Sequence, residues 1–143
     1  MNKIIIASDH GGFELKNIIK EYLTTNNYEV LDLGTNDTNS CDYPIYAQKL
    51  CKEILNGNFK RGILVCGTGL GMQIAANRNK GIRAVCVSDT FSAKMSREHN
   101  NSNVLCLGGR VLGKGLALEI VDNWLKTEFQ GERHQKRIDM YDK

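Results

Sequence analysis

The chain has 143 residues, which is close to the usual length of one domain and enough to bury a sizeable hydrophobic core. Apolar residues make up 41% and charged residues 24%, and the formal net charge of +3 is small and spread along the chain. A nucleic-acid polymer is bound through a concentrated basic surface, so this composition predicts no nucleic-acid partner. No apolar run approaches the roughly 20 residues that cross a bilayer, so we expect no membrane partner.

The cysteines, five in all, are odd in number and widely spaced, and no Cys-x-x-Cys pair occurs. That spacing argues against a zinc site or a thioredoxin-like redox pair, so we expect no metal. Free thiols are typical of the reducing cytosol, and the first residues lack the basic and apolar regions of a secretion signal. We therefore expect a cytoplasmic protein.

Short apolar, β-rich runs alternate with amphipathic stretches along the chain. We expect strands at residues 3–7, 29–33, 62–66, 83–87 and 103–108. We expect helices at residues 13–24, 45–55, 71–77, 92–98 and 114–127, and a last one after Gly131. Pro44 is well placed to start the second helix. This alternation is typical of a parallel sheet with helices on both faces.

Chemically capable residues follow directly after the expected strands. The carboxyl ends of parallel strands meet at one edge of the sheet, and ligands bind in the crevice outside that edge. These residues are Asp9 and His10 after the first strand, Gly34 and Thr35 after the second, Cys66 to Gly69 around the end of the third, Ser88 and Asp89 after the fourth, and Gly109 and Arg110 after the fifth. Elsewhere an Asp-His pair would be a cap or a surface pair, but this edge makes Asp9 and His10 candidate site residues.

A glycine-rich loop with the sequence GTGLG spans residues 67–71, between the third strand and the third helix. Its backbone N–H groups can point at an anion, and a tight turn that simply requires glycine is the alternative. Met72 stands where the dinucleotide fingerprint has its third glycine, and the loop does not follow the first strand. The loop therefore predicts an anion-stabilising turn rather than a dinucleotide site.

Cys66 ends the third expected strand, directly before this loop and a helix N-terminus. A cysteine at a strand end is often one more buried, small hydrophobic residue, which is the role we expect for Cys86 and Cys106. The partial positive charge of a helix N-terminus favours ionisation of a nearby thiol, so Cys66 is the candidate thiolate base. No role is indicated for Cys41 or Cys51.

His99 precedes the fifth expected strand, so it falls at the edge of its own sheet opposite Cys66. It is either a helix C-terminal histidine that interacts with the dipole or a catalytic residue that serves a neighbouring subunit. Arg133 and Arg137 are four residues apart and share a helix face, which is either a solvated basic face or a phosphate clamp. Arg110 alone favours neither role, and His134 receives none.

The order of the motifs resembles the type B ribose-5-phosphate isomerases, within the wider ribose/galactose isomerase family. The matching segments are Ser8-Asp9-His10-Gly11-Gly12, Asp42-Tyr43-Pro44, Cys66-Gly67-Thr68-Gly69-Leu70-Gly71, Gly81-Ile82-Arg83-Ala84, His99-Asn100-x-x-Asn103-Val104, Gly109-Arg110-Val111 and Gly131-x-Arg133-His134-Gln135-x-Arg137. Each motif is weak alone, but their joint order is specific and covers essentially the whole chain.

The resemblance implies a Rossmann-like three-layer α/β/α sandwich with a five-stranded parallel sheet, formed by residues 1–143 as a single domain. It implies no metal, no organic cofactor, and interconversion of ribose 5-phosphate and ribulose 5-phosphate through an enediolate. In this sequence Cys66 would be the base, His99 would open the sugar ring, and Thr68 would orient the thiol or its proton. The implied substrate-binding residues are Asp9, His10, Tyr43, Gly67, Gly69, Leu70, Gly71, Asn100, Arg110, Arg133 and Arg137.

Relatives that isomerise galactose 6-phosphate divide these motifs between two different chains. This chain carries both sets, and the resemblance therefore implies a homodimer, or a tetramer, with shared active sites. His99 would then reach the site of a partner subunit, and the C-terminal helix, at about residues 131–143, would pack on that partner. Two alternatives stay open: an isomerase of a six-carbon sugar phosphate, such as allose 6-phosphate or galactose 6-phosphate, and a non-catalytic sugar-phosphate-binding module.

Overall fold

A parallel sheet forms the centre of the computed structural model, which describes residues 2–143. Its strands are β1 (Lys3–Ser8), β2 (Glu29–Asp32), β3 (Gly62–Cys66), β4 (Ala84–Cys86) and β5 (Val104–Gly108). They lie in the order β2-β1-β3-β5-β4, so the expected five-stranded parallel sheet is confirmed. β3 has the expected bounds, whereas β4 is shorter than residues 83–87 because only three of its residues pair with β5.

Burial explains why these segments are strands. Every residue of β3 and β5 is buried, as a parallel sheet covered on both faces requires. Along β1 the side chains alternate between two hydrophobic clusters: Ile4 and Ile6 pack in one, and Ile5 and Ala7 in the other. The sheet therefore separates two cores.

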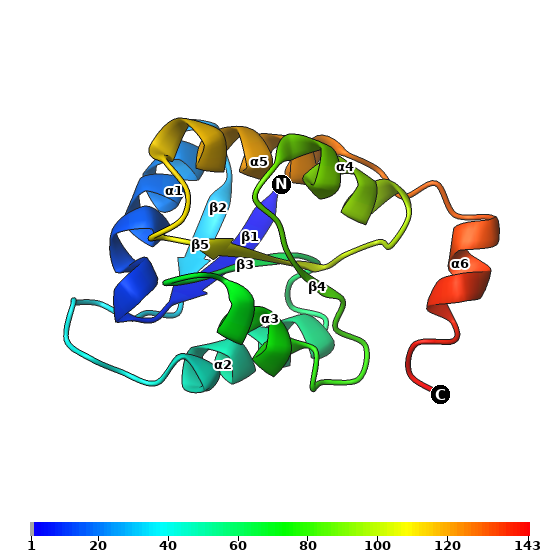
Figure 1. Cartoon of the computed structure of the whole chain (residues 1–143), viewed down its shortest axis with the longest axis horizontal. Helices are drawn as coiled ribbons and strands as arrows, with labels where there is room; N and C mark the ends of the chain where they lie inside the picture. Colours follow the sequence, from blue (N-terminus) through cyan, green and yellow to red (C-terminus); the bar gives the residue numbers. More distant parts are fainter. Residues whose placement is uncertain (1) are drawn as a thin grey trace.

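Helices cover both faces of the sheet, which confirms the three-layer sandwich (Figure 1). The helices are η1 (His10–Gly12), α1 (Phe13–Thr25), α2 (Tyr43–Leu55), α3 (Leu70–Ala76), α4 (Thr90–Glu98), α5 (Lys114–Lys126) and α6 (Arg133–Ile138). α1, α4 and α5 bury their apolar stripes on one face, and Trp124 is the largest side chain buried there. α2 and α3 cover the other face, and Pro44 lies in the first turn of α2, as expected.

The connections between strands reverse direction between β1 and β3. The chain passes from β1 to β2 on one side and then crosses to β3, which pairs with the other side of β1. Ligands in open α/β sheets bind outside the carboxyl ends of the strands at such a switch point. The segments that leave the sheet here begin with Asp9 after β1 and Gly67 after β3.

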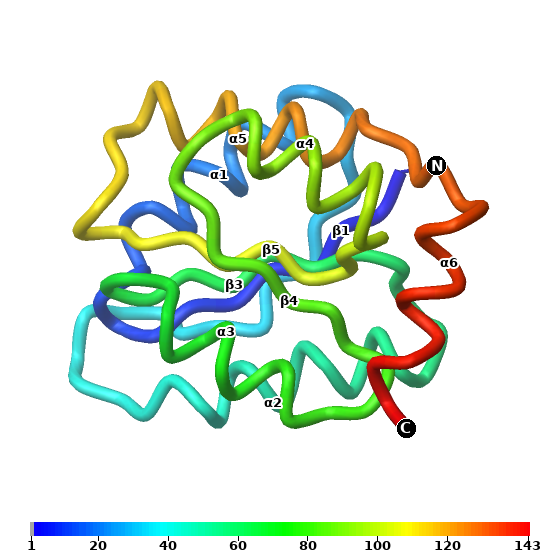
Figure 2. Tube along the Cα trace, turned by 45° about the vertical axis from the view of Figure 1, so that its right-hand side comes forward, coloured from blue at the N-terminus to red at the C-terminus, as the bar shows by residue number. Residues whose placement is uncertain are grey.

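α6 lies at the end of the molecule opposite the loops that follow β1 and β5 (Figures 1 and 2). The helix ends at Ile138, earlier than the expected range of about 131–143, because the last residues form turns. Within the part of the chain that the structure describes, none of the helices has the length and apolar character needed to cross a membrane.

Candidate active site

Cys66 occupies the last position of β3, and its side chain is only 5% exposed. The backbone N–H of Gly69 donates to Cys66 Sγ across 3.1 Å. This contact places a backbone donor of the glycine-rich loop directly beside the sulfur. The carbonyl oxygen of Cys66 accepts the N–H of Gly109 at 2.8 Å, which ties this strand end to the turn after β5.

The other cysteines lie in different surroundings, and all are free thiols. Burial raises the pKa of the Cys51 thiol to about 11 and the pKa of the Cys106 thiol well above its ordinary value. Cys106 is fully buried in β5, as expected. The same expectation for Cys86 is wrong, because the edge strand β4 leaves it half-buried, with its thiol 3.5 Å from the carbonyl oxygen of Thr68.

Gly69 gives the loop its shape. Its φ of 83° lies in the left-handed region, and a Cβ there would lie 2.8 Å from Cys86 Sγ and 3.0 Å from the carbonyl carbon of Leu107. The loop is thus a turn that requires glycine and also a turn that aims an N–H at sulfur. Thr68 Oγ1 accepts the N–H of Leu70, where α3 begins. Within residues 2–143 no hydrogen bond joins the Thr68 hydroxyl to the thiol, so its orienting role stays a prediction.

The segment after β1 starts with Asp9 and lies against the glycine-rich loop. The N–H of Asp9 donates to the carbonyl oxygen of Val65 at 3.2 Å, and Asp9 Oδ1 accepts the N–H of Gly12 at 3.1 Å. Asp9 therefore caps η1, which is one of the two ordinary roles that an Asp-His pair can have. The approach is close, since a Cβ at Gly11 would lie 3.1 Å from the backbone nitrogen of Gly67.

His10 is oriented by the loop between β2 and α2. The backbone N–H of Cys41 donates to His10 Nδ1 across 3.2 Å. Nδ1 is therefore the acceptor, and the neutral ring carries its proton on Nε2. That leaves His10 with an N–H on its other side, which is available to an anionic or hydroxyl-bearing ligand.

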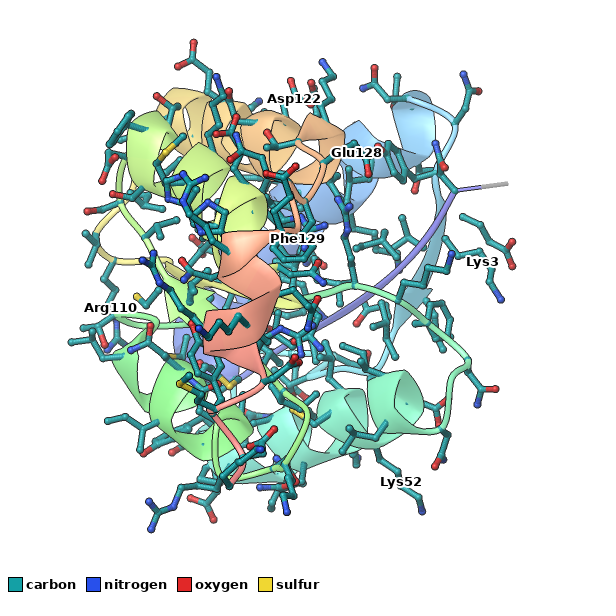
Figure 3. The ribbon with its side chains drawn as sticks, turned by 90° about the vertical axis from the view of Figure 1, so that its right-hand side faces the viewer. Lys3, Lys52, Arg110, Asp122, Glu128 and Phe129 are labelled. Atoms are coloured by element: carbon teal, nitrogen blue, oxygen red, sulfur yellow. The ribbon has the colours of Figure 1, made fainter. Side chains whose placement is uncertain are left out.

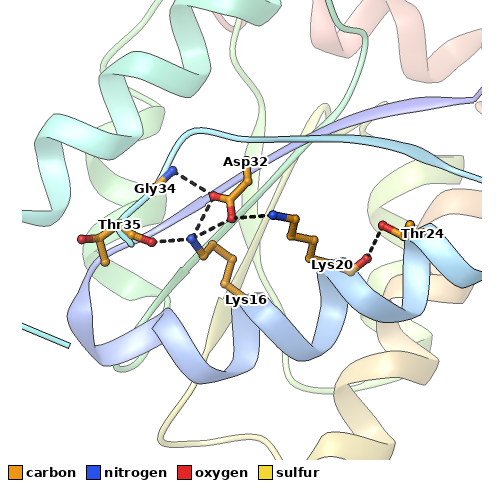
Figure 4. Close-up of polar contacts among 6 residues, drawn as sticks. All are labelled: Lys16, Lys20, Thr24, Asp32, Gly34 and Thr35. Carbon is orange, nitrogen blue, oxygen red and sulfur yellow. Dashed lines mark hydrogen bonds and ion pairs between the residues drawn. The ribbon is translucent and has the colours of Figure 1, made fainter. Parts of the chain in front are cut away.

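A buried lysine holds the start of this loop (Figure 4). Lys16 Nζ lies 2.8 Å from Oδ1 and 3.0 Å from Oδ2 of Asp32, and it also donates to the carbonyl oxygen of Thr35. The N–H of Gly34 donates to Asp32 Oδ1 at 2.9 Å. Burial alone would raise the pKa of Asp32, but these hydrogen bonds and the positive charge of Lys16 outweigh it, so the pKa is lowered.

Tyr43 and Arg110 flank the glycine-rich loop. The Tyr43 ring lies against Gly71, where a Cβ would be 2.7 Å from Tyr43 Cζ. The N–H of Arg110 donates to the carbonyl oxygen of Gly67 at 3.0 Å, and its guanidinium lies beside the same glycine. One chain thus brings together the first group of predicted site residues, Asp9, His10, Tyr43, Cys66, Gly67, Thr68, Gly69, Leu70, Gly71 and Arg110.

A second group gathers where α4 ends. The rings of His99 and His134 are stacked, with centroids 4.3 Å apart and planes inclined by 15°. Asn100 Nδ2 donates to the hydroxyl oxygen of Tyr141 at 3.2 Å. His99 follows the last residue of α4 and precedes β5, so it lies at the amino edge of the sheet, as expected.

Arg133 and Arg137 belong to the second group and lie exposed on α6, the helix that faces the viewer in Figure 3. Neither arginine forms an ion pair with a carboxylate within residues 2–143. No hydrogen bond in this part of the chain joins the first group to the second, and α6 lies far from the carboxyl edge (Figure 1). Nor does any cluster of three metal-ligating side chains occur among the described residues.

Sequence reasoning missed His134, Lys16 and the backbone of Cys41. His134 stands between the two arginines of its motif, and that position was a usable signal. Lys16 is adjacent to the apolar stripe of α1, but its partner Asp32 is 16 residues away on β2. The Cys41 contribution is a backbone N–H, which every residue except proline carries, so no side-chain pattern could reveal it.

The polar groups lie at the switch point of the sheet, around a cysteine that accepts a backbone N–H. This arrangement defines an α/β protein that binds a small ligand at the carboxyl edge of its sheet. A comparison with known proteins assigns it more closely. The chain belongs to the ribose/galactose isomerase family: the family described as Ribose/Galactose Isomerase matches residues 4–141.

Individual relatives are similar to this chain over nearly their whole length. Ribose-5-phosphate isomerase B of Escherichia coli is 47% identical over 139 residues, covering 97% of this chain and 93% of the relative. A ribose 5-phosphate isomerase structure from Thermotoga maritima has a TM-score of 0.97 and 51% identity, covering 99% of this chain and 97% of that one. A ribose-5-phosphate isomerase B structure from Mycoplasma genitalium with bound ribulose-5-phosphate has a TM-score of 0.91 and 45% identity, covering 96% of this chain and 91% of that one. The expected family and fold are confirmed.

Proposed function

We propose that this chain interconverts ribose 5-phosphate and ribulose 5-phosphate by aldose–ketose isomerisation. One observation carries the proposal: the Cys66 sulfur receives the N–H of Gly69 at the switch point of the sheet, beside Asp9. Family membership and the relative that holds ribulose-5-phosphate support a sugar phosphate as the substrate. The chemistry needs no group beyond the side chains and backbone of the protein.

The complete site is formed by two copies of the chain. The Cys66 group of one copy meets the His99 group of the other. The reason is that within one copy the two groups lie at opposite edges of the sheet. Four large apolar side chains are more than half exposed on α3, at the start of α4 and after β5: Leu70, Ile74, Phe91 and Val111. Such apolar surface beside a site favours burial by a second copy, in a homodimer or in a tetramer built from such dimers.

Ring opening is the first step. His99 of the second copy donates a proton to the ring oxygen of the furanose as the bond between C1 and that oxygen breaks. The C1 hydroxyl passes its proton to solvent water, water returns a proton to His99, and the open-chain aldehyde results. The carbonyl group then acidifies the hydrogen on C2, which is the atom that the base must remove.

Isomerisation of the open chain is the second step. The Cys66 thiolate removes the C2 proton, and negative charge moves to the C1 oxygen of an enediolate. N–H groups of the glycine-rich loop stabilise that oxygen as its charge develops. The thiol then returns the proton to C1 while the proton on the C2 oxygen moves to the C1 oxygen, and the product is the ketose.

The remaining residues bind and orient the substrate. Arg133 and Arg137 of the second copy hold the phosphate, and this binding energy fixes the reacting carbons beside Cys66. The sugar hydroxyls contact Asp9, His10, Tyr43, Asn100 and Arg110 in this arrangement. Thr68 uses one lone pair to accept the N–H of Leu70, so its own O–H can orient the thiol or its proton.

The proposal is tested by comparing turnover of ribose 5-phosphate with turnover of allose 6-phosphate by the purified protein. We expect kcat/KM to favour the pentose, and a preference for the hexose would replace the substrate with a six-carbon sugar phosphate. Cys66→Ala is expected to bind the sugar phosphate but to lose at least about a hundredfold in rate, the lower range for loss of a general base. Binding without turnover in the wild type would indicate a non-catalytic module.

A further inference from the structure

His134 is the buried residue of a helix whose other polar side chains are exposed. Its side chain is 5% exposed, whereas Arg133, Gln135, Lys136 and Arg137 all face solvent. One face of its ring stacks on the ring of His99, at a centroid distance of 4.3 Å. Parallel rings at this distance restrict each other's rotation, so His134 covers one face of the imidazole that the proposed mechanism uses.

Hydrogen bonds on both sides of the stack hold the C-terminal segment against the end of α4. Before α6, the N–H of Gln130 donates to the carbonyl oxygen of Glu98 at 3.1 Å, and Gln130 Nε2 donates to Glu98 Oε2 at 3.0 Å. After α6, Asn100 Nδ2 donates to the Tyr141 hydroxyl at 3.2 Å. The segment that carries His134 is therefore held against the end of α4 by contacts on both sides of the helix.

The surroundings of His134 lower the pKa of its ring. Burial, followed by the positive charges of Arg133, His99 and Arg137, lowers the pKa of His134, and only Glu132 acts in the opposite sense. His134 Nε2 has no hydrogen-bond partner within residues 2–143. Among these residues the His134 ring therefore contacts His99 through its face and not through a hydrogen bond from Nε2.

We propose that His134 is a positioning residue for sugar-ring opening, because its stacked ring fixes the plane of the His99 imidazole; this inference rests on the proposed function. His99 is half-exposed at the end of a helix, where an unsupported side chain samples several rotamers. Proton transfer to the ring oxygen requires one orientation of the donor nitrogen. The stack supplies that orientation before the substrate arrives.

The test separates ring opening from the cysteine step. Conversion of ribose 5-phosphate requires ring opening, whereas ribulose 5-phosphate has no ring to open, since its 5-oxygen carries the phosphate. Exchange of the C1 proton of ribulose 5-phosphate with deuterium oxide therefore reports substrate binding and the Cys66 step, without ring opening. Both rates are measured for the wild type, His134→Ala and His134→Phe.

We expect His134→Ala to lower kcat for ribose 5-phosphate by roughly three- to tenfold, the range that the loss of one aromatic contact predicts. His134→Phe keeps a flat ring and is expected to stay within about twofold of the wild type. The exchange rate is expected to be unchanged in both variants, which also shows that both variants fold and assemble.

Three results would overturn the inference. Equal losses in the two variants would mean that a nitrogen atom, and not the ring face, is required. An exchange rate that falls in parallel with isomerisation would point to substrate binding or to general damage. An unaffected His134→Ala would leave the stack without a role. Failure of the wild type to isomerise ribose 5-phosphate would instead refute the proposed function itself.

Discussion

The backbone N–H of Gly69 lies 3.1 Å from the sulfur of Cys66, three residues earlier in the chain. The loop that follows the cysteine thus folds back and donates to it, and the left-handed conformation of Gly69 makes that return possible. Catalytic chemistry and backbone conformation are therefore linked at one residue, and a change at Gly69 alters both.

Gly69→Ala is expected to lower the free energy of unfolding by about 3 kcal/mol. Alanine is strained in the left-handed backbone conformation, and its Cβ is crowded by neighbouring atoms. Activity should fall further than stability explains, because the N–H leaves its position beside the sulfur. Urea denaturation and kcat measure the two effects. Gly57→Ala is the matched control, since Gly57 has a similar φ of 82° but no atom within 4 Å of the new Cβ.

The control separates conformational strain from crowding. Gly57→Ala should lose only about 1 to 2 kcal/mol, the cost of the left-handed conformation, and should keep full activity. Equal losses in the two variants would show that the contacts of Gly69 with Cys86 and Leu107 do not matter.

Mixing two inactive variants should restore activity if sites are shared between chains. In a hybrid of Cys66→Ala with His99→Ala, one of the two sites combines an intact Cys66 with an intact His99. Random exchange makes about half of the dimers hybrids, so roughly a quarter of all sites become active, as two-fold symmetry requires. The measurement is turnover of ribose 5-phosphate after mixing.

Subunit exchange in that experiment must be verified independently, for example by mass spectrometry of dimers that carry different tags. Full exchange without any recovery of turnover would show that each site is complete within one chain. Each variant alone, carried through the same treatment, provides the baseline.

Lys16→Met is expected to destabilise the protein by about 3 kcal/mol, because it leaves the Asp32 carboxylate without its buried partner. Lys20→Met is the control, since Lys20 also contacts Asp32, at 3.3 Å, but is 44% exposed and should cost less than about 1 kcal/mol. Chemical denaturation at neutral pH measures both changes.

The same pair predicts a pH dependence. The pKa of Asp32 is lower in the folded chain than in the unfolded one, so its contribution to stability is present above the unfolded value of about 3.9 and is lost as pH falls through the folded value. The gap in stability between the wild type and Lys16→Met should therefore narrow below about pH 4. A gap that is constant between neutral and acid pH would contradict this assignment.

Much of the fold was predictable because buried segments have an apolar local composition. β3 is apolar throughout, and its observed bounds equal the expected ones. The edge strand β4 has fewer buried residues, and there the expected range was too long. The collection of Asp9, Cys66 and Arg110 at one edge followed from parallel topology alone, without any knowledge of side-chain contacts.

The parts that sequence could not predict depend on contacts between distant segments. His134 belongs to a helix of six residues, too short to show a periodic pattern, and its burial depends on α4, more than 30 residues earlier. The orientation of His10 depends on a backbone donor in a loop without regular structure. Hydrophobic periodicity reveals neither contact, and only the place of His134 between two arginines marked that residue at all.

The opposite placement of the two groups on each chain has a genetic consequence under the shared-site proposal. A chain that carries both faults, at Cys66 and at His99, spoils both sites of a dimer formed with a normal chain, since each site then contains one faulty half. Two chains that are defective at different residues, one at Cys66 and one at His99, form a dimer with one active site. A chain defective at both residues inactivates both sites of its dimer with a normal chain. A defect of the second kind would be dominant in a cell that makes both chains.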